Sequence, residues 1–103
     1  MGKIILNWTY DSDMLECPEY ISNNLADYQI KFDAWVSDKN REQPSFWVKY
    51  VVNGITYEGV SFGSEDFVEW LKQYVIQPGE EVFFIKREFT PDCDELKLPH
   101  INF

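Results

Sequence analysis

Apolar and polar residues alternate in the first part of the chain, a pattern typical of strands. Ile4, Leu6 and Trp8 lie two positions apart, which predicts a strand over residues 3–9 with one buried face. The same period of two continues over residues 28–36, where apolar residues take every second position: Tyr28, Ile30, Phe32, Ala34 and Val36. We predict a second strand there, with Trp35 on its opposite face.

Residues 47–60 predict a β-hairpin with a defined register. Asn53 and Gly54 lie between two β-rich runs, and both favour the positive φ angles of a two-residue turn. This turn opposes Lys49 to Glu58 and divides the side chains between two faces. We predict a core-facing set (Val48, Tyr50, Val52, Ile55 and Tyr57) and a mixed set (Trp47, Lys49, Val51, Thr56, Glu58 and Val60).

Helical spacing follows the hairpin. Ser64 is a favourable N-cap, carboxylates occupy the first turn, and Pro78–Gly79 ends the helix. The apolar residues at helical spacing are Phe67, Val68, Leu71, Tyr74 and Val75. Residues 81–89 then predict a last strand, and the tail is expected to be an ordered loop packed by Leu96, Leu98, Ile101 and Phe103.

Polar segments separate these elements. The acidic stretch after residue 9, broken by Pro18, predicts a loop that leads into a short irregular or helical segment around residues 19–26. Residues 37–45 predict the most mobile loop. The element order indicates an α+β fold: a mainly antiparallel sheet of about five strands with one main helix on one face. At 103 residues, we predict a single domain over residues 1–103.

The charge of the chain limits its partners. Nine Lys and Arg against 18 Asp and Glu give a net charge of −9. This charge repels nucleic-acid phosphates and anionic lipids and attracts basic proteins, so we predict no nucleic-acid partner and no membrane partner. An acidic surface also serves solubility alone.

The start of the chain has no signal-peptide pattern, and no apolar run approaches the roughly 20 residues of a membrane span. Cys17 and Cys93 are too few for the disulfide framework of a small secreted domain. We predict a cytoplasmic protein with two free thiols; a Cys17–Cys93 pair is the alternative.

Few residues offer catalytic or metal chemistry. His100 is the single histidine, which leaves a catalytic triad without a plausible base. The sequence DSDMLE lacks the Gly and Glu of a calcium loop, and Cys17, Cys93 and His100 lack zinc spacing. The glycines before the helix match no phosphate-binding motif. We predict no enzymatic activity, no metal and no cofactor.

Acidic and aromatic residues are interleaved after the first strand: Tyr10, Asp11, Asp13, Glu16, Glu19 and Tyr20. A second acidic group lies in the tail: Asp92, Asp94 and Glu95. General acid–base catalysis needs a pocket that separates the pKa values of two carboxyls, and these polar loops imply none. We instead predict an exposed surface that meets Lys and Arg of a basic protein.

Trp35 and Trp47 lie on the strand faces predicted to point away from the core, with Asp33 and Glu58 near them if the two strands are adjacent. An open sheet face with tryptophans and mixed charge is typical of an interface centre. The alternative is that a loop, or the tail with Phe103, covers both rings.

The opening sequence MGKIILNWTYDSD resembles the start of the cloacin-type immunity proteins. These small acidic proteins are cytosolic antidotes to secreted nuclease toxins of the colicin or contact-dependent-inhibition type. They also begin with a short strand that ends near a Trp and continues into an acidic loop. The resemblance covers roughly the first twenty residues. It implies an acidic sheet surface that faces a ribonuclease domain, and it assigns no individual contact residue here.

Three functions fit these observations. The first, which we predict, is an immunity protein that binds a basic toxin domain of the nuclease type 1:1 and has no activity of its own. The second is a phage-encoded inhibitor of a host nuclease, similar to an anti-CRISPR protein. The third is a small enzyme or sugar-binding module, which requires a concave pocket around Trp35 and Trp47.

Overall fold

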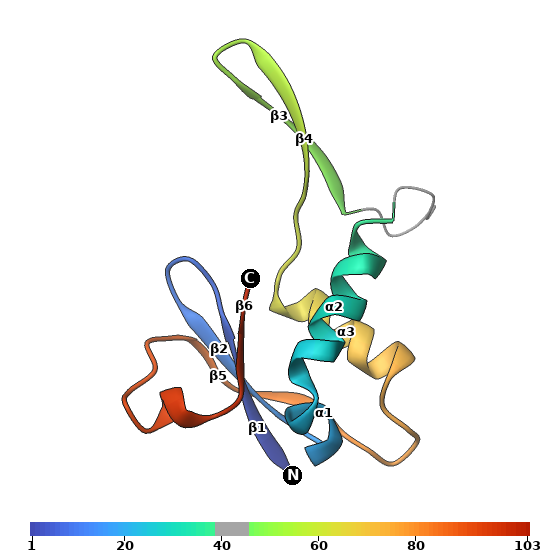
Figure 1. Ribbon diagram of the computed structural model, residues 1–103, viewed down its shortest axis with the longest axis vertical. Coiled ribbons are helices and arrows are strands. Elements are labelled where there is room, and N and C mark those ends of the chain that lie inside the picture. Colours follow the sequence, from blue (N-terminus) through green and yellow to red (C-terminus); the bar gives the residue numbers. More distant parts are fainter. Residues whose placement is uncertain (39–45) are drawn as a thin grey trace.

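Four strands form the main sheet, in the order β5–β2–β1–β6. They are β1 (Gly2–Asn7), β2 (Ser12–Cys17), β5 (Phe83–Phe89) and β6 (His100–Asn102). β1 and β5 both run antiparallel to β2, whereas the short β6 runs parallel to β1. These elements come from a computed structural model, which describes residues 1–38 and 46–103 (Figure 1).

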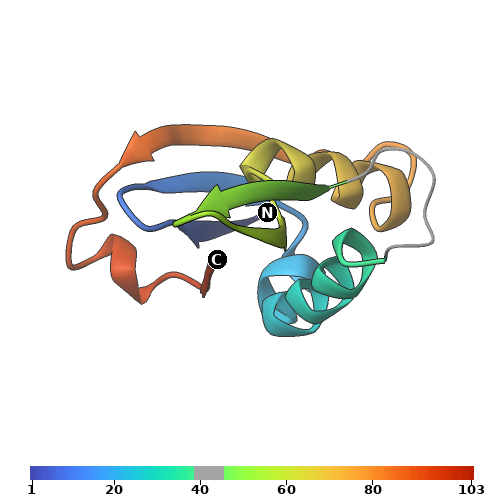
Figure 2. The ribbon, with the colours of Figure 1, turned by 90° about the horizontal axis from the view of Figure 1, so that it is seen from above.

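Three helices lie on the same side of this sheet (Figure 2). They are α1 (Glu19–Asn23), α2 (Leu25–Val36) and α3 (Ser64–Tyr74). Ile4, Leu6 and Leu15 of the sheet share one buried cluster with Phe32 of α2 and Phe67 of α3. Ile21 of α1 belongs to the same cluster, so the core sits between the sheet and the three helices.

The middle of the core is aromatic. Phe32 is fully buried, and its ring lies 5.0–6.1 Å from five other rings, measured between centroids. Those rings belong to Trp35, Phe62, Phe67, Trp70 and Phe103. Such edge-to-face and offset contacts add to the burial of apolar area.

The C-terminal tail covers the other face of the sheet. It contains the 3-10 turn η1 (Glu95–Lys97) and β6, and its Pro99 carbonyl accepts a hydrogen bond from the Ile5 amide at 3.0 Å. Ile5 and Met14, which share this second face, are both buried. The predicted packing of the tail is confirmed for Ile101 and Phe103, which join the core cluster, but Leu96 is exposed.

A two-stranded hairpin projects from this body (Figure 1). It consists of β3 (Trp47–Val52) and β4 (Ile55–Val60), which pair with each other and with no other described strand. Asn53 and Gly54 form the turn with φ angles of 52° and 78°, and the predicted register is confirmed at each pair. The predicted core-facing set is wrong, because Val48, Tyr50, Val52, Ile55 and Tyr57 are all exposed.

The strand predicted over residues 28–36 is also wrong, since these residues belong to helix α2. Leu25, Phe32 and Val36 are buried, whereas Ile30, which the period of two placed beside Phe32, is 67% exposed. A spacing of four residues fits both periods, so Phe32 and Val36 did not distinguish a strand from a helix.

The acidic loop predicted after residue 9 is in part a central strand. β2 begins at Ser12 and is paired on both sides, by β1 and β5. Its polar residues Ser12 and Asp13 are buried together with Met14, Leu15 and Cys17. The short helix α1, by contrast, lies within the irregular or helical segment predicted around residues 19–26.

The predicted α+β class with a mainly antiparallel sheet is confirmed, although three helices rather than one contribute buried residues to the core on this face of the sheet. Of the loop predicted to be mobile, residues 39–45 lie outside the described part of the chain. Within residues 1–38 and 46–103, no helix combines the length and the apolar character that crossing a bilayer demands.

Candidate functional site: the projecting hairpin

The hairpin exposes large hydrophobic side chains on both faces. Between 43% and 67% of the surface of each is accessible for Val48, Tyr50, Val51, Val52, Ile55 and Tyr57. In the body, exposed residues of these kinds are scattered, as at Tyr10, Ile30 and Tyr74, whereas on the hairpin they are adjacent. An exposed apolar surface of this extent marks an interaction site in a folded protein.

Contacts at its base attach the hairpin to the helices. Trp35 of α2 packs against Phe46 and against Tyr74 of α3, with ring centroids 5.4 and 5.7 Å apart. The indole N–H of Trp47 donates to the carbonyl of Ser37 at 3.2 Å, and the Ser61 amide donates to the carbonyl of Phe46 at 2.8 Å. The hairpin therefore starts from a fixed base.

Both predicted interface tryptophans lie at this base and not on an open sheet face. Trp35 belongs to α2 and is partly buried in the core cluster, so its predicted position on a strand is wrong. Trp47 is partly buried at the first position of β3. Asp33 is exposed on α2, although partial desolvation raises the pKa of its carboxyl. Glu58 is exposed on β4.

Tyr50 and Tyr57 form a stacked pair across the hairpin. Their ring centroids are 5.6 Å apart and their planes are inclined by 19°. The Tyr50 ring also lies over Gly59, because a Cβ added to Gly59 would come 3.3 Å from Tyr50 Cε1. A glycine beneath an aromatic ring on the neighbouring strand leaves room for that ring, so this pair is preorganised.

The charges of the hairpin lie on one face. Lys49 and Glu58 face each other with 3.9 Å between Nζ and Oε1, as the register predicted. The opposite face carries no ionisable group other than the two tyrosine hydroxyls. We call the set Val48, Tyr50, Val52, Ile55 and Tyr57 the apolar face, and the set Trp47, Lys49, Val51, Thr56, Glu58 and Val60 the mixed face.

Asp13, predicted as an exposed contact residue, is instead buried and fully engaged, so that expectation is wrong. One carboxylate oxygen accepts from the Ser64 hydroxyl, which itself accepts from the Trp8 indole N–H at 2.7 Å. The other accepts from the Glu88 amide at 2.9 Å and from Arg87 Nε at 3.2 Å. Asp13 therefore ties β2 to α3 and to β5.

The hydrogen bonds of Asp13 account for the backbone conformation at Glu88 and for the N-cap of α3. Glu88 has a φ of 50°, in a part of β5 where the pairing with β2 is irregular, and its amide points to Asp13. Ser64 was predicted as the N-cap of α3, but the N-cap is Gly63, whose amide donates to Asp66 at 2.8 Å. The Ser64 hydroxyl is used by Asp13 instead.

Electrostatics favour the charged form of Asp13. Burial raises the pKa of this carboxyl, but the hydrogen bonds from Ser64, Glu88 and Arg87 outweigh burial and leave the pKa below its ordinary value of 3.8. Arg87 also binds Glu65, whose pKa is lowered mainly by that hydrogen bond. Asp13 is thus a structural carboxylate.

The other acidic residues fall into separate groups. Tyr10, which is 95% exposed, and the partly buried Asp11 lie at the β1–β2 turn, beside Thr90 and Pro91 at the end of β5. Glu19 and Tyr20 lie beyond the opposite end of β2, a six-residue strand that spans about 17 Å. The partly buried Glu16 faces Lys3 on the sheet surface. One continuous acidic ledge is therefore not formed.

The carboxylates of the tail form hydrogen bonds and ion pairs within the tail and with β5. Asp92 and Glu95 exchange hydrogen bonds between side chain and backbone at 2.8 and 3.1 Å. Glu95 also pairs with Lys86 at 2.5 Å, and the exposed Asp94 lies 3.5 Å from Lys97. Asp92 and Asp94 remain exposed beside this cluster, and Glu95 is partly buried.

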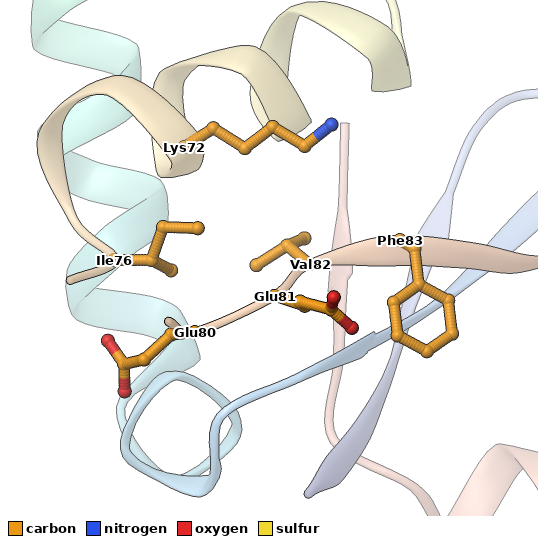
Figure 3. Close-up of a pocket in the computed structure, with 6 residues that line it drawn as sticks. All are labelled: Lys72, Ile76, Glu80, Glu81, Val82 and Phe83. Atoms are coloured by element: carbon orange, nitrogen blue, oxygen red, sulfur yellow. The ribbon is translucent and has the colours of Figure 1, made fainter. Parts of the chain in front are cut away.

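An open hollow of about 380 Å³ lies between the end of α3 and the start of β5 (Figure 3). Ile76, Val82 and Phe83 give it an apolar lining, and Glu81 extends toward the Phe83 ring. Glu80 at its edge already accepts from the Tyr20 hydroxyl at 2.7 Å; burial and this bond raise the pKa of Tyr20 to about 12. Neither Trp35 nor Trp47 lines this hollow, so it does not match the sugar site that the sequence left open.

Residues with reactive side chains stand apart from one another. Cys17 is buried, which raises its pKa to about 11, whereas Cys93 is exposed; both thiols are free. His100 is exposed, with Nδ1 3.0 Å from the Leu98 carbonyl. Among the residues that the structure describes, no three His, Cys, Asp or Glu side chains are grouped as metal ligands would be.

Comparison of the chain with protein-family models, with curated protein sequences and with solved structures gave no significant match. The candidate site therefore rests on geometry alone. Sequence patterns located the hairpin and its register, but they gave no sign that its apolar face is exposed.

Proposed function

We propose that the chain is an inhibitor of the immunity-protein kind, which binds a basic toxin domain and uses the β3–β4 hairpin as its binding arm. One observation carries this proposal. The hairpin stands away from the body (Figure 1), and six of its large hydrophobic side chains are 43–67% exposed.

An isolated two-stranded hairpin is marginally stable in water. Exposed valine, isoleucine and tyrosine side chains gain free energy when a second surface removes them from water, at roughly 25 cal/mol per Å². Tyrosine is also one of the residues that most often dominate the energy of an interface. A partner that covers this hairpin therefore stabilises both the contact and the arm.

The net charge of −9 indicates the character of that partner. A negative field accelerates encounter with a basic surface and repels acidic competitors. Nuclease domains hold phosphates with Lys and Arg, so they present a surface of the required sign. The resemblance of the first residues to cloacin-type immunity proteins suggests the same class of partner.

Inhibition needs binding and no chemistry of its own. The exposed carboxylates form separate groups around the body, among them Glu19 and Asp92, and they contribute to the field without forming one continuous contact. In this proposal the acidic body sets the rate of association, and the hairpin sets the lifetime of the complex.

The test is affinity capture on the immobilised chain from a lysate of the source organism at low salt, with identification by mass spectrometry and a repeat at high salt. We expect a basic nuclease domain whose activity is lost when the chain is added at a 1:1 ratio. Retention of no basic protein at either salt concentration contradicts the proposal. A host nuclease in place of a toxin would support the phage-inhibitor alternative.

A further inference from the structure

The two faces of the hairpin differ in a way that bears on how it binds. The apolar face has Val48, Tyr50, Val52, Ile55 and Tyr57, with Gly59 beneath the Tyr50 ring. The mixed face has the Lys49–Glu58 ion pair, in which the Lys49 and Glu58 side chains are 74% and 48% exposed. The centre of a protein interface is depleted of charge and enriched in aromatic residues, whereas its rim is polar.

We infer that the apolar face is the contact face, and that its occupant is an apolar groove bordered by Lys and Arg on the basic partner. This inference rests on the proposed function and specifies the contact surface. The mixed face, with its charged pair, remains toward solvent in the complex.

Charge selects this occupant over a second copy of the chain. Each copy carries a net charge of −9, so two copies repel each other, whereas a basic protein is attracted to the same field. The apolar face has no charge that would have to be desolvated when it enters a groove.

The Tyr50–Tyr57 pair is suited to be the anchor of this contact. The Tyr50 ring lies over Gly59 and is already stacked on the Tyr57 ring, so little side-chain freedom is lost on binding. Their hydroxyl groups give each ring a polar end, which suits the border between an apolar groove and its charged rim.

The hairpin supplies matched variants for the test. Val52 and Ile55 form the cross-strand pair next to the turn on the apolar face, and Val51 and Thr56 form the adjacent pair on the mixed face. V52A/I55A and V51A/T56A thus remove side chains of similar size from opposite faces. Neither variant touches the core, and circular dichroism would confirm that each is folded.

The probe is the basic protein retained in the capture experiment, in purified form, titrated against the full chain and each variant at 0.15 M salt. We expect V52A/I55A and Y50A/Y57A each to weaken binding by about 30-fold or more, through faster dissociation. V51A/T56A should change affinity by less than about threefold.

Equal affinity for all variants, or a larger loss for V51A/T56A, would overturn the inference and leave the proposed function standing. If no basic protein is retained, the proposed function fails and the inference fails with it. Sedimentation of the free chain tests whether a second copy occupies the apolar face. A dimer that V52A/I55A dissociates and V51A/T56A does not would assign the face to a second copy. That result would also overturn the inference.

Discussion

The largest aromatic cluster of the body is buried, whereas the aromatic pair of the hairpin is exposed. In the body, Phe32 is fully buried among five other rings, while on the hairpin the stacked Tyr50 and Tyr57 remain exposed by 49% and 43%. The body has a sheet, a helical layer and a tail that cover one another, whereas the hairpin has no covering layer among the described residues. Strand pairing alone thus fixes a register without burying either face.

This contrast separates stability from binding. The free energy of folding should come almost entirely from the body, and the hairpin should be free to change without unfolding the chain. Substitutions in the body and in the hairpin test that division.

Phe32→Ala should cost about 3–5 kcal/mol in the free energy of unfolding, because it leaves a cavity at the centre of the aromatic cluster. Tyr57→Ala should cost less than about 1 kcal/mol, since Tyr57 remains 43% exposed and stacks on one neighbour only among the rings described. Urea unfolding followed by circular dichroism measures both. Similar losses for the two variants would remove the distinction between the regions.

Asp13→Asn should destabilise the body by about 1.5–3 kcal/mol, because the amide cannot accept all the hydrogen bonds that Ser64, Arg87 and Glu88 donate. Asp11→Asn is the matched control two positions earlier, at the turn, and should change stability by less than about 0.5 kcal/mol. Denaturant unfolding at pH 7 compares the two.

The same carboxyl predicts a pH dependence. The pKa of Asp13 is lower in the folded chain than its ordinary value of 3.8, so its stabilising contribution is complete above that value and is lost as the pH falls through the folded pKa. Below about pH 4 the wild-type chain should therefore lose stability faster than Asp13→Asn. Parallel pH profiles would show that the network does not depend on the charge of Asp13.

Removal of the Lys49–Glu58 pair should have the smallest effect. The two groups are exposed and 3.9 Å apart, so a double-mutant cycle of Lys49→Ala and Glu58→Ala should give a coupling of about 0.2–0.5 kcal/mol at most. A coupling above about 1 kcal/mol would mean that the hairpin contributes more to folding than its exposure indicates.

Local sequence signals predicted the elements that depend on neighbouring residues. Asn53–Gly54 sets the hairpin register by its positive φ angles, and the spacing of Phe67, Val68 and Leu71 sets the buried face of α3. Both follow from short-range chemistry.

Features that depend on distant residues were missed. Asp13 is tolerated in a central strand because Ser64 and Arg87, 51 and 74 positions away, complete its hydrogen bonds. The exposure of the hairpin likewise depends on where the sheet and helices end, which no pattern within residues 47–60 reveals. The candidate site was therefore predicted in its secondary structure and not in its accessibility.

The most direct test of the binding arm is the affinity of a chain whose residues 48–59 are replaced by a short Gly-Ser turn, with the Trp47–Val60 pair at the base retained. We predict that this variant unfolds cooperatively with nearly wild-type stability and no longer binds the basic protein captured by the intact chain. Wild-type affinity in the folded, shortened chain would show that the hairpin is not the binding arm.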